Sequence, residues 1–399
     1  MRTMTPALAL LAASLTTACG DKPAPPQDAS DIATKTLIVD THIDVPYRLT
    51  EEYEDVTEAT AKGDFDYPRA RAGGLDVAFM SIYIPAEYFE SGGGRKLADE
   101  MIDEIESIAA RASDRFAVAH STADVASNFA AGKISLALGM ENGTGLDGDL
   151  ANLDHFYARG IRYITLAHSK SNRLSDSSYD ENRPLGGLSP LGREAVARMN
   201  ALGMMIDISH LTDAAAMQVL ELSTAPVIAS HSSARKFTPG FERNMDDDLI
   251  RALARNGGVV QINFGSAFLT AESNRAFMRY WDAQEAFIEE HGYADDSPEV
   301  EAFGKQYKAE NPIPLATLDD VLDHIDHVVA IAGIDHVGIG SDFDGVGDSL
   351  PEGLKDVSDY PGLVAGLLNR GYSLPDIEKI CGANVMRVWR DVESRAAGS

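Results

Sequence analysis

Eight short apolar segments recur along the chain, and stretches with helical patterning separate them. Several of these segments are apolar throughout, which is typical of parallel strands covered on both faces. The apolar segments span residues 36–44, 75–85, 134–141, 161–168, 203–210, 226–232, 257–264 and 336–344. Helical patterning covers residues 97–111, 193–202, 213–222, 249–256 and 318–332. Strands that alternate with helices in this way predict an α/β fold, a (β/α)8 barrel of the TIM type.

The alternative α/β architecture is a doubly wound open sheet, which would need a glycine-rich, nucleotide-type turn after its first strand. The first apolar segment ends instead in Thr41-His42-Ile43-Asp44. At 399 residues the chain could hold two domains of average size. However, it shows no internal repeat and no second composition regime. We therefore expect a single catalytic barrel domain over residues 34–399.

The gap between the expected seventh and eighth strands is unusually long. It includes residues 266–314, in which Trp281, Phe287 and Tyr307 stand among many charged residues. Residues 271–290 have a helical pattern. We expect a helical insertion over one end of the barrel, where it would act either as a lid or as a decoration.

The N-terminus has the pattern of an export signal. Met1 and Arg2 supply positive charge, residues 7–15 form a short apolar run, and small residues lead to Cys19. The apolar run is too short to span a bilayer. The layout resembles a bacterial lipoprotein signal, in which the cysteine is lipidated and becomes the new N-terminus.

This resemblance implies that residues 1–18 are removed as a signal peptide and that Cys19 is the lipidation site. Residues 19–33 would then be a tether, and the protein would be lipid-anchored in the bacterial cell envelope, on the periplasmic side. The alternative is an ordinary secretory signal in which Cys19 is incidental. If Cys19 is lipidated, Cys381 has no partner for a disulfide bond.

The charge balance excludes one class of partner. The chain has 34 Lys and Arg against 62 Asp and Glu, a net charge of −28. Nucleic acids and anionic membrane surfaces attract basic proteins, so we expect no nucleic-acid partner.

Six of the eight expected strands end in residues that commonly bind metal ions. In barrel enzymes the chemistry takes place at the carboxyl ends of the strands. One such residue could be a helix cap, a turn residue or a buried structural histidine, but six strand ends together predict a functional site. The residues are His42, Asp44, Glu141, His168, His210, His231 and Asp342.

These residue types suit a pair of metal ions. Imidazoles and carboxylates without thiolates favour zinc or a similar divalent ion in a catalytic site. Two ions about 3.5–4 Å apart need a bridging carboxylate, and Glu141 is the natural bridge. His42 and Asp44 would complete one site, and His210 and His231 the other.

The remaining two residues suggest roles in catalysis. A water between two such ions ionises near neutral pH and becomes a nucleophile. Asp342 could take a proton from this water and pass it to a leaving amine. His168 could donate a hydrogen bond to the developing oxyanion.

Short motifs around these residues resemble the membrane (renal) dipeptidases, peptidase family M19, in order from about residue 36 to 390. The most specific are the Asp-x-Ser-His and Gly-Ser-Asp-Phe-Asp-Gly motifs. The motifs are Val39-Asp40-Thr41-His42-Ile43-Asp44, Gly139-Met140-Glu141, Thr165-Leu166-Ala167-His168, Ile206-Asp207-Ile208-Ser209-His210, Ser230-His231-Ser232 and Gly340-Ser341-Asp342-Phe343-Asp344-Gly345.

The resemblance implies a zinc-dependent dipeptidase on a TIM-type barrel of the amidohydrolase kind. It implies two Zn²⁺ per chain, with the same two ligand sets bridged by Glu141. It also implies that His168 contacts the substrate carbonyl and that Asp342 is the acid/base. Arg243 matches an Arg-Asn pair that binds the free carboxylate of the substrate, although without the resemblance it would look like a surface ion-pair residue. Family members commonly dimerise, so a homodimer is compatible with the sequence.

Three functions remain open at this stage. The first is hydrolysis of free dipeptides, L-Xaa-Xaa, with a D-residue accepted on the C-terminal side. The second is a related metal amidohydrolase that acts on N-acyl amino acids or lactams. The third is a non-catalytic binding lipoprotein. All the expected ligands and Asp342 are present, which favours an enzyme. The preferred side chains of the substrate do not follow from the sequence.

Overall fold

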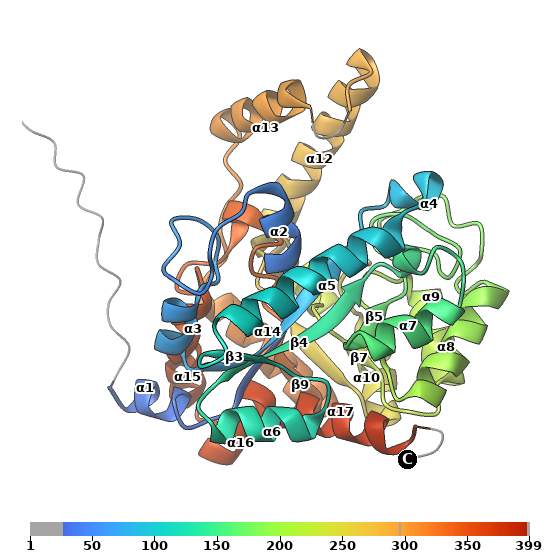
Figure 1. The fold of residues 1–399 in the computed structure, drawn as a ribbon. Helices are drawn as coiled ribbons and strands as arrows, with labels where there is room; N and C mark the ends of the chain where they lie inside the picture. Colours follow the sequence, from blue (N-terminus) through green and yellow to red (C-terminus); the bar gives the residue numbers. More distant parts are fainter. Residues whose placement is uncertain (1–26, 295–296, 397–399) are drawn as a thin grey trace, which may run out of the picture.

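A computed structural model describes residues 27–294 and 297–396. Within these residues one parallel sheet runs in the order β2-β1-β9-β8-β7-β6-β5-β4-β3, and a further pairing of β2 with β4 closes it into a barrel (Figure 1). The strands are β1 Ile38–Ile43, β2 Leu75–Tyr83, β3 Phe116–Val118, β4 Ile134–Glu141, β5 Ile161–Thr165, β6 Met205–Asp207, β7 Ile228–Ala229, β8 Val259–Ile262 and β9 Val337–Ile339. The predicted (β/α)8 barrel is confirmed, with β3 as an additional strand.

The strand β3 is the strand that the sequence analysis did not predict. It pairs with the first half of β4, where Phe116 lies opposite Ile134. On the same side of β4, β5 begins only at the pair Leu138–Ile161. A strand of three residues is too short to produce a recognisable hydrophobic period. Most of the observed strands are shorter than the apolar segments that predicted them, because the chain usually leaves the sheet before the polar residue at the end of the segment.

Helices surround the barrel and connect successive strands. Five expected helical segments correspond to α5, α8, α9, α10 and α14. The C-terminal segment of the barrel domain forms α15 to α17. The helices α2, α3, α6 and α7 were not predicted. The helices are α1 Gln27–Ala33, α2 Val45–Glu51, α3 Tyr67–Gly73, α4 Tyr88–Ser91, α5 Gly94–Arg111, α6 Thr122–Ala130, α7 Ala151–Ala158, α8 Pro190–Leu202, α9 Asp213–Leu222, α10 Asp247–Asn256, α11 Ser266–Leu269, α12 Ala271–His291, α13 Pro298–Glu310, α14 Leu318–Ala332, α15 Tyr360–Asn369, α16 Leu374–Glu378 and α17 Asn384–Ser394.

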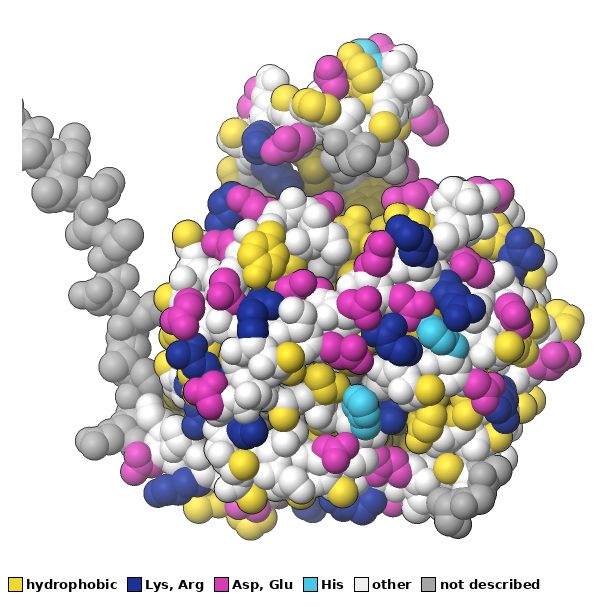
Figure 2. Space-filling model, viewed as in Figure 1, with side chains coloured by type: hydrophobic (Ala, Val, Ile, Leu, Met, Phe, Trp, Pro, Cys, Tyr) yellow, Lys and Arg dark blue, Asp and Glu magenta, His cyan; other side chains and the backbone are white. Residues whose placement is uncertain are grey.

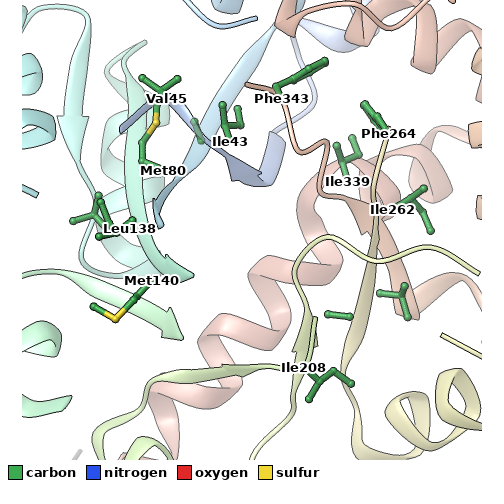
Figure 3. Close-up of a cluster of buried hydrophobic side chains, with 14 of the residues drawn as sticks. Ile43, Val45, Met80, Leu138, Met140, Ile208, Ile262, Phe264, Ile339 and Phe343 are labelled. Atoms are coloured by element: carbon green, nitrogen blue, oxygen red, sulfur yellow. The ribbon is translucent and has the colours of Figure 1, made fainter. Parts of the chain in front are cut away.

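The buried apolar side chains form an inner and an outer layer. The inner cluster includes Val39, Phe79 and Tyr163, and Trp389 of α17 packs against Phe79 with a ring-centroid distance of 5.2 Å. The outer cluster packs the strands against the helices, and Figure 3 shows part of it, with Leu138 and other side chains on the outside of the ring of strands. Because α17 lies at the opposite end of the barrel from α12 (Figure 1), the end of the barrel near α12 is left for a site.

The long segment between β8 and β9 contains α11, α12 and α13. Thr270 caps the N-terminus of α12, because its side chain accepts a hydrogen bond from the Ser273 backbone N–H. Gly292, in the left-handed conformation, caps the C-terminus. Figures 1 and 2 show α12 and α13 standing above the rest of the molecule. Figure 2 also shows hydrophobic side chains in the recess at the base of this lobe.

The expected tether overlaps an ordered element. Residues 27–33 form α1, in which Ala29 and Ala33 are buried, and α1 contacts α15. Two small apolar residues four positions apart lie on one face of a helix, which explains the packing. The folded region therefore begins before the expected boundary at residue 34. Cys19 and the signal segment lie outside the described residues. None of the described helices is long and apolar enough to cross a membrane.

Candidate metal centre and substrate cleft

The metal-ligand candidates meet at the carboxyl end of the barrel. His42 and Glu141 lie at the ends of their strands, and Asp44 directly follows β1. The other four candidates lie in the loops that follow β5, β6, β7 and β9. They are His168, His210, His231 and Asp342. All of these side chains except His42 line one cleft, with a volume of about 450 Å³, within the usual range for a small-molecule site.

Glu141 occupies the centre of this cluster, and its two carboxylate oxygens face different partners. Oε1 lies 3.0 Å from Nε2 of His210 and 3.2 Å from Nε2 of His231. Oε2 lies 3.5 Å from Nε2 of His42, which is itself 3.3 Å from Oδ2 of Asp44. The carboxylate thus separates two groups of ligand atoms and faces each with one oxygen.

A hydrogen bond fixes the orientation of the His42 ring. Its Nδ1 lies 2.9 Å from the Tyr163 hydroxyl, which donates to the Thr41 carbonyl oxygen. The hydroxyl must therefore accept from an Nδ1–H, so in the neutral ring the lone pair is on Nε2, the atom that faces Glu141. Gly139 makes room for Tyr163, because a Cβ at that position would lie 2.0 Å from Cζ of the tyrosine ring.

A similar relay orients His231. Its Nδ1 lies 2.7 Å from the Ser230 hydroxyl, which donates to Oδ2 of Asp207 at 2.6 Å. Asp207 also accepts hydrogen bonds from the Thr165 hydroxyl and from the backbone N–H groups of Ser209 and Ser230. The His231 ring therefore donates from Nδ1, and the Nε2 lone pair faces the centre of the site.

The electrostatics keep two of the imidazoles neutral. Burial, together with the charge of Arg243, lowers the pKa of His210 and of His231 well below the usual range. Burial favours the protonated form of Glu141, but the neighbouring histidines, His42 among them, hold the pKa of this carboxyl well below its usual range. The centre therefore combines neutral His210 and His231 with an ionised Glu141, which are the forms that bind metal ions. At His42, the neighbouring Tyr163, Asp44 and Glu141 outweigh burial and raise the pKa well above its usual range.

His42 and Asp44 form what we call the first position of the metal centre. Two buried atoms there, Nε2 of His42 and Oδ2 of Asp44, lack a hydrogen-bond partner within the described residues. An unpaired buried polar atom is costly, and a divalent cation would satisfy both. Three groups of residues each bring their possible ligand atoms within 4.8 Å of one another. They are His42 with Glu141 and His231, Glu141 with His168 and His210, and His42 with Asp44 and Asp342. The donor set therefore fits a pair of divalent ions bridged by Glu141.

Asp342 lies beside the first position. Its Oδ2 accepts a hydrogen bond from Nδ2 of Asn263 at 2.7 Å. Burial and the Asp44 carboxylate raise the pKa of Asp342 to about 7, which suits a group that exchanges protons near neutral pH. Gly345 packs against both carboxylates, since a Cβ there would lie 2.3 Å from an oxygen of each. Asn263 was not identified from the sequence, because no pattern in the sequence marks a single asparagine as the partner of Asp342.

Two site residues adopt backbone conformations that are uncommon for residues other than glycine. His210 has φ of 69° and Asp342 has φ of 65°. Such conformations cost free energy and are frequent at functional sites, where the surrounding structure holds them. Asp344, which directly precedes Gly345, also has φ of 65°.

His168 and Arg243 lie at the edge of the metal centre. Nε2 of His168 is 3.6 Å from Oε1 of Glu141, and burial lowers the pKa of this imidazole, so the neutral ring keeps one N–H to donate. Arg243 is buried, yet among the described residues its guanidinium donates only to the Ser232 hydroxyl at 2.7 Å and to the His231 carbonyl at 2.9 Å. Nε of Arg243 has no partner in the described part of the chain. A buried cation without a carboxylate partner is a favourable place for an anion.

The residues that hold the imidazoles in place through hydrogen bonds were not identified from the sequence. Tyr163 was treated only as a strand residue. Asp207 and Ser230 stand inside two of the motifs given above, Ile206-Asp207-Ile208-Ser209-His210 and Ser230-His231-Ser232, and these motifs were the signals that could have marked them. A closed parallel barrel with a cluster of His, Asp and Glu side chains that fits a pair of divalent ions, at the carboxyl ends of its strands, is typical of amidohydrolase-type metal enzymes.

Comparisons with known proteins identify the family within this class. The model of the membrane dipeptidase family (Peptidase family M19) matches residues 26–399. Dipeptidase tcpJ of Claviceps purpurea is 35% identical over 342 residues, which cover 84% of this chain and 71% of that protein. The chain belongs to the membrane dipeptidase family, peptidase family M19, and is a metallo-dipeptidase.

Solved structures agree with this assignment. The probable dipeptidase PvdM from Pseudomonas aeruginosa superposes with a TM-score of 0.80 at 30% identity, covering 93% of this chain and 98% of that chain. A metallo peptidase from Rhodobacter sphaeroides, solved with a phosphinate mimic of the dipeptide L-Ala-D-Ala, has a TM-score of 0.72 at 26% identity. That comparison covers 90% of this chain and 99% of the other.

Proposed function

We propose that the protein is a zinc-dependent dipeptidase that hydrolyses free L-Xaa-Xaa dipeptides and accepts a D-residue on the C-terminal side. The observation that carries this proposal is the position of Glu141, whose two oxygens face separate groups of ligand atoms. His42 and Asp44 would hold one zinc ion with Glu141. His210 and His231 would hold the other.

The roles of the remaining residues follow from their positions. When bound, two zinc ions would polarise the scissile carbonyl and lower the pKa of a water. Asp342, with its pKa near 7, would accept a proton and return it to the leaving amine. His168 would donate a hydrogen bond to the carbonyl oxygen as negative charge develops there. Arg243 would bind the free carboxylate, which excludes peptides that continue beyond the second residue.

A panel of four substrates tests this function: L-Ala-L-Ala, L-Ala-D-Ala, N-acetyl-L-Ala-L-Ala and L-Ala-L-Ala-L-Ala. We expect zinc-dependent release of amino acids from the two free dipeptides only. We also expect Asp342→Asn to abolish this activity while retaining zinc. Faster cleavage of the acetylated compound would instead indicate a deacylase-type amidohydrolase, and the role of Arg243 would need revision. Bound zinc without any turnover would favour a binding lipoprotein.

We also propose that the protein is exported and anchored by a lipid on Cys19, in a bacterial cell envelope and facing the periplasm. The support is the pattern of the first residues, in which a short apolar run and small residues precede Cys19. Mass spectrometry of the mature N-terminus tests this, and Cys19→Ala should release the protein from membranes. A homodimer is also proposed, on the resemblance alone. Size-exclusion chromatography with light scattering tests it.

A further inference from the structure

One wall of the cleft consists of aromatic rings to which the proposed chemistry gives no role. It is formed by Tyr179 in the loop after β5, Phe268 of α11, and Phe277 and Trp281 of α12. We call these four residues the aromatic wall. None of them is fully buried, and 36% of Trp281 is exposed. Large apolar surfaces that remain open inside a cleft usually contact a ligand.

The rings support one another through a continuous series of contacts. Tyr179 stacks on Trp281 with centroids 6.1 Å apart and ring planes at 11°, and Trp281 lies 5.9 Å from Phe277. Phe241 connects this group to Phe268, because its ring is 5.9 Å from Tyr179 and 5.7 Å from Phe268. Such packing holds the wall in place before a substrate binds.

The wall begins beside the residue proposed to bind the substrate carboxylate. Cζ of Arg243 lies 5.3 Å from the centroid of the Phe268 ring. The Tyr179 ring lies 5.8 Å from His210, on the side of Glu141 Oε1. A substrate whose carboxylate rests on Arg243 therefore places its C-terminal residue next to the wall.

Acidic groups line other parts of the cleft. Asp44 and Asp342 lie beside His42, on the side of Glu141 Oε2, and Glu51 of α2 also lines the cleft. Asp44 and Asp342 are assigned above to the metal ion and to proton transfer, so Glu51 is the carboxylate that remains for the free amino group of a dipeptide. The arginine among the lining groups, Arg48, differs from Arg243 in that two carboxylates compensate its charge, Asp344 at 3.1 Å and Glu54 at 2.9 Å, although its Nη2 has no hydrogen-bond partner in the described residues. The distribution of charge therefore orients the substrate in the same direction as Arg243.

We propose that the aromatic wall is the subsite for the side chain of the C-terminal residue and that it selects large apolar or aromatic residues there. This inference rests on the proposed function, because Arg243 sets the direction of the substrate. It also assigns a role to the insertion, since α12 contributes two of the four rings. A phenyl side chain of the substrate would cover ring surface that is otherwise in contact with water.

The test compares kcat/KM for L-Ala-L-Phe, L-Phe-L-Ala and L-Ala-L-Ala. For the wild type we expect L-Ala-L-Phe to exceed L-Ala-L-Ala about tenfold, within the range that apolar pocket contacts provide. L-Phe-L-Ala should show no such advantage. Trp281→Ala should lower the ratio for L-Ala-L-Phe over L-Ala-L-Ala about tenfold, and Phe277→Ala should lower it in the same direction.

Tyr293→Ala is the matched control. Tyr293 follows α12 and has the same exposed fraction as Trp281, 36%, but its ring contacts are with His291 and Phe287, and it is not among the residues that line the cleft. This variant should keep the wild-type ratio. Thermal unfolding of each variant shows whether it is folded, and Phe277→Ala replaces Trp281→Ala if the latter is not.

The outcomes separate the two proposals. If the wild type cleaves none of the three dipeptides with zinc bound, the proposed function fails. If it cleaves them with equal kcat/KM, or prefers L-Phe-L-Ala, the subsite assignment is overturned and the dipeptidase activity stands. If the cleft variants keep the wild-type ratio, or change it no more than Tyr293→Ala does, the aromatic wall has only a structural role.

Discussion

Replacing Tyr163 by phenylalanine tests the argument that hydrogen bonds outside the metal centre prepare its ligands. The Tyr163 hydroxyl lies 2.9 Å from Nδ1 of His42 and 2.9 Å from the Thr41 carbonyl oxygen, and all three residues are fully buried. Tyr163→Phe leaves one buried donor and one buried acceptor without a partner. At about 1–3 kcal/mol for each such group, and allowing for some relaxation, the metal-free protein should lose about 2–4 kcal/mol of stability.

The same substitution should weaken metal binding. Without the hydroxyl as an acceptor, nothing favours the proton on Nδ1 of His42, and the ring can place it on Nε2, where it blocks coordination. Loss of a partner of this kind typically lowers metal affinity about 10–100-fold, equivalent to about 1.4–2.7 kcal/mol. Denaturant unfolding of the metal-free protein measures the first effect. Zinc titration against a competing chelator measures the second.

Tyr360→Phe is the control for this experiment. The Tyr360 hydroxyl is buried and donates to Oδ2 of Asp40 at 2.6 Å, but it contacts no imidazole. This variant should lose stability while its zinc affinity remains within about threefold of the wild type, a change of less than about 1 kcal/mol. If Tyr163→Phe binds zinc as tightly as the wild type, or if both variants weaken binding equally, the Tyr163 hydroxyl does not prepare His42 for the metal ion.

Three further predictions concern other parts of the barrel. Gly139→Ala should destabilise the protein by about 1–3 kcal/mol in denaturant unfolding and weaken zinc binding, because the new Cβ would overlap the Tyr163 ring; wild-type stability would contradict this. Asn263→Ala should lower kcat about 100-fold by releasing Asp342, and unchanged kcat, with zinc content equal to the wild type, would argue against a positioning role. Burial lowers the pKa of His324 to about 4 from 6.5, so the unfolded chain binds a proton that the folded chain does not, and stability falls as pH decreases from 6.5 towards 4. In urea unfolding, the stability advantage of the wild type over His324→Gln should therefore shrink by up to about 3 kcal/mol over this window, whereas a constant difference would show that His324 has the same pKa in the folded and unfolded states.

Much of the fold could be predicted from the sequence, because parallel strands that are buried on both faces consist almost entirely of apolar residues. The segment 134–141 matches β4 in full, and 213–222 and 318–332 match α9 and α14. The short strand β3 and the end of the tether could not be predicted in the same way. Both depend on a partner elsewhere in the chain: β3 on β4, and α1 on α15.

The residues that can form the centre are recognisable without the structure, since a strand that ends in His or Glu places that side chain at one end of any parallel barrel. How these residues act together depends on the folded barrel. Closure through the β2–β4 pairing encloses Tyr163, so that its hydroxyl meets His42, 121 positions away in the chain. The same packing places Phe277 and Trp281 of the insertion over the cleft. Hydrogen-bond partners and cleft walls depend on distances between remote segments, and these distances exist only once the barrel has closed.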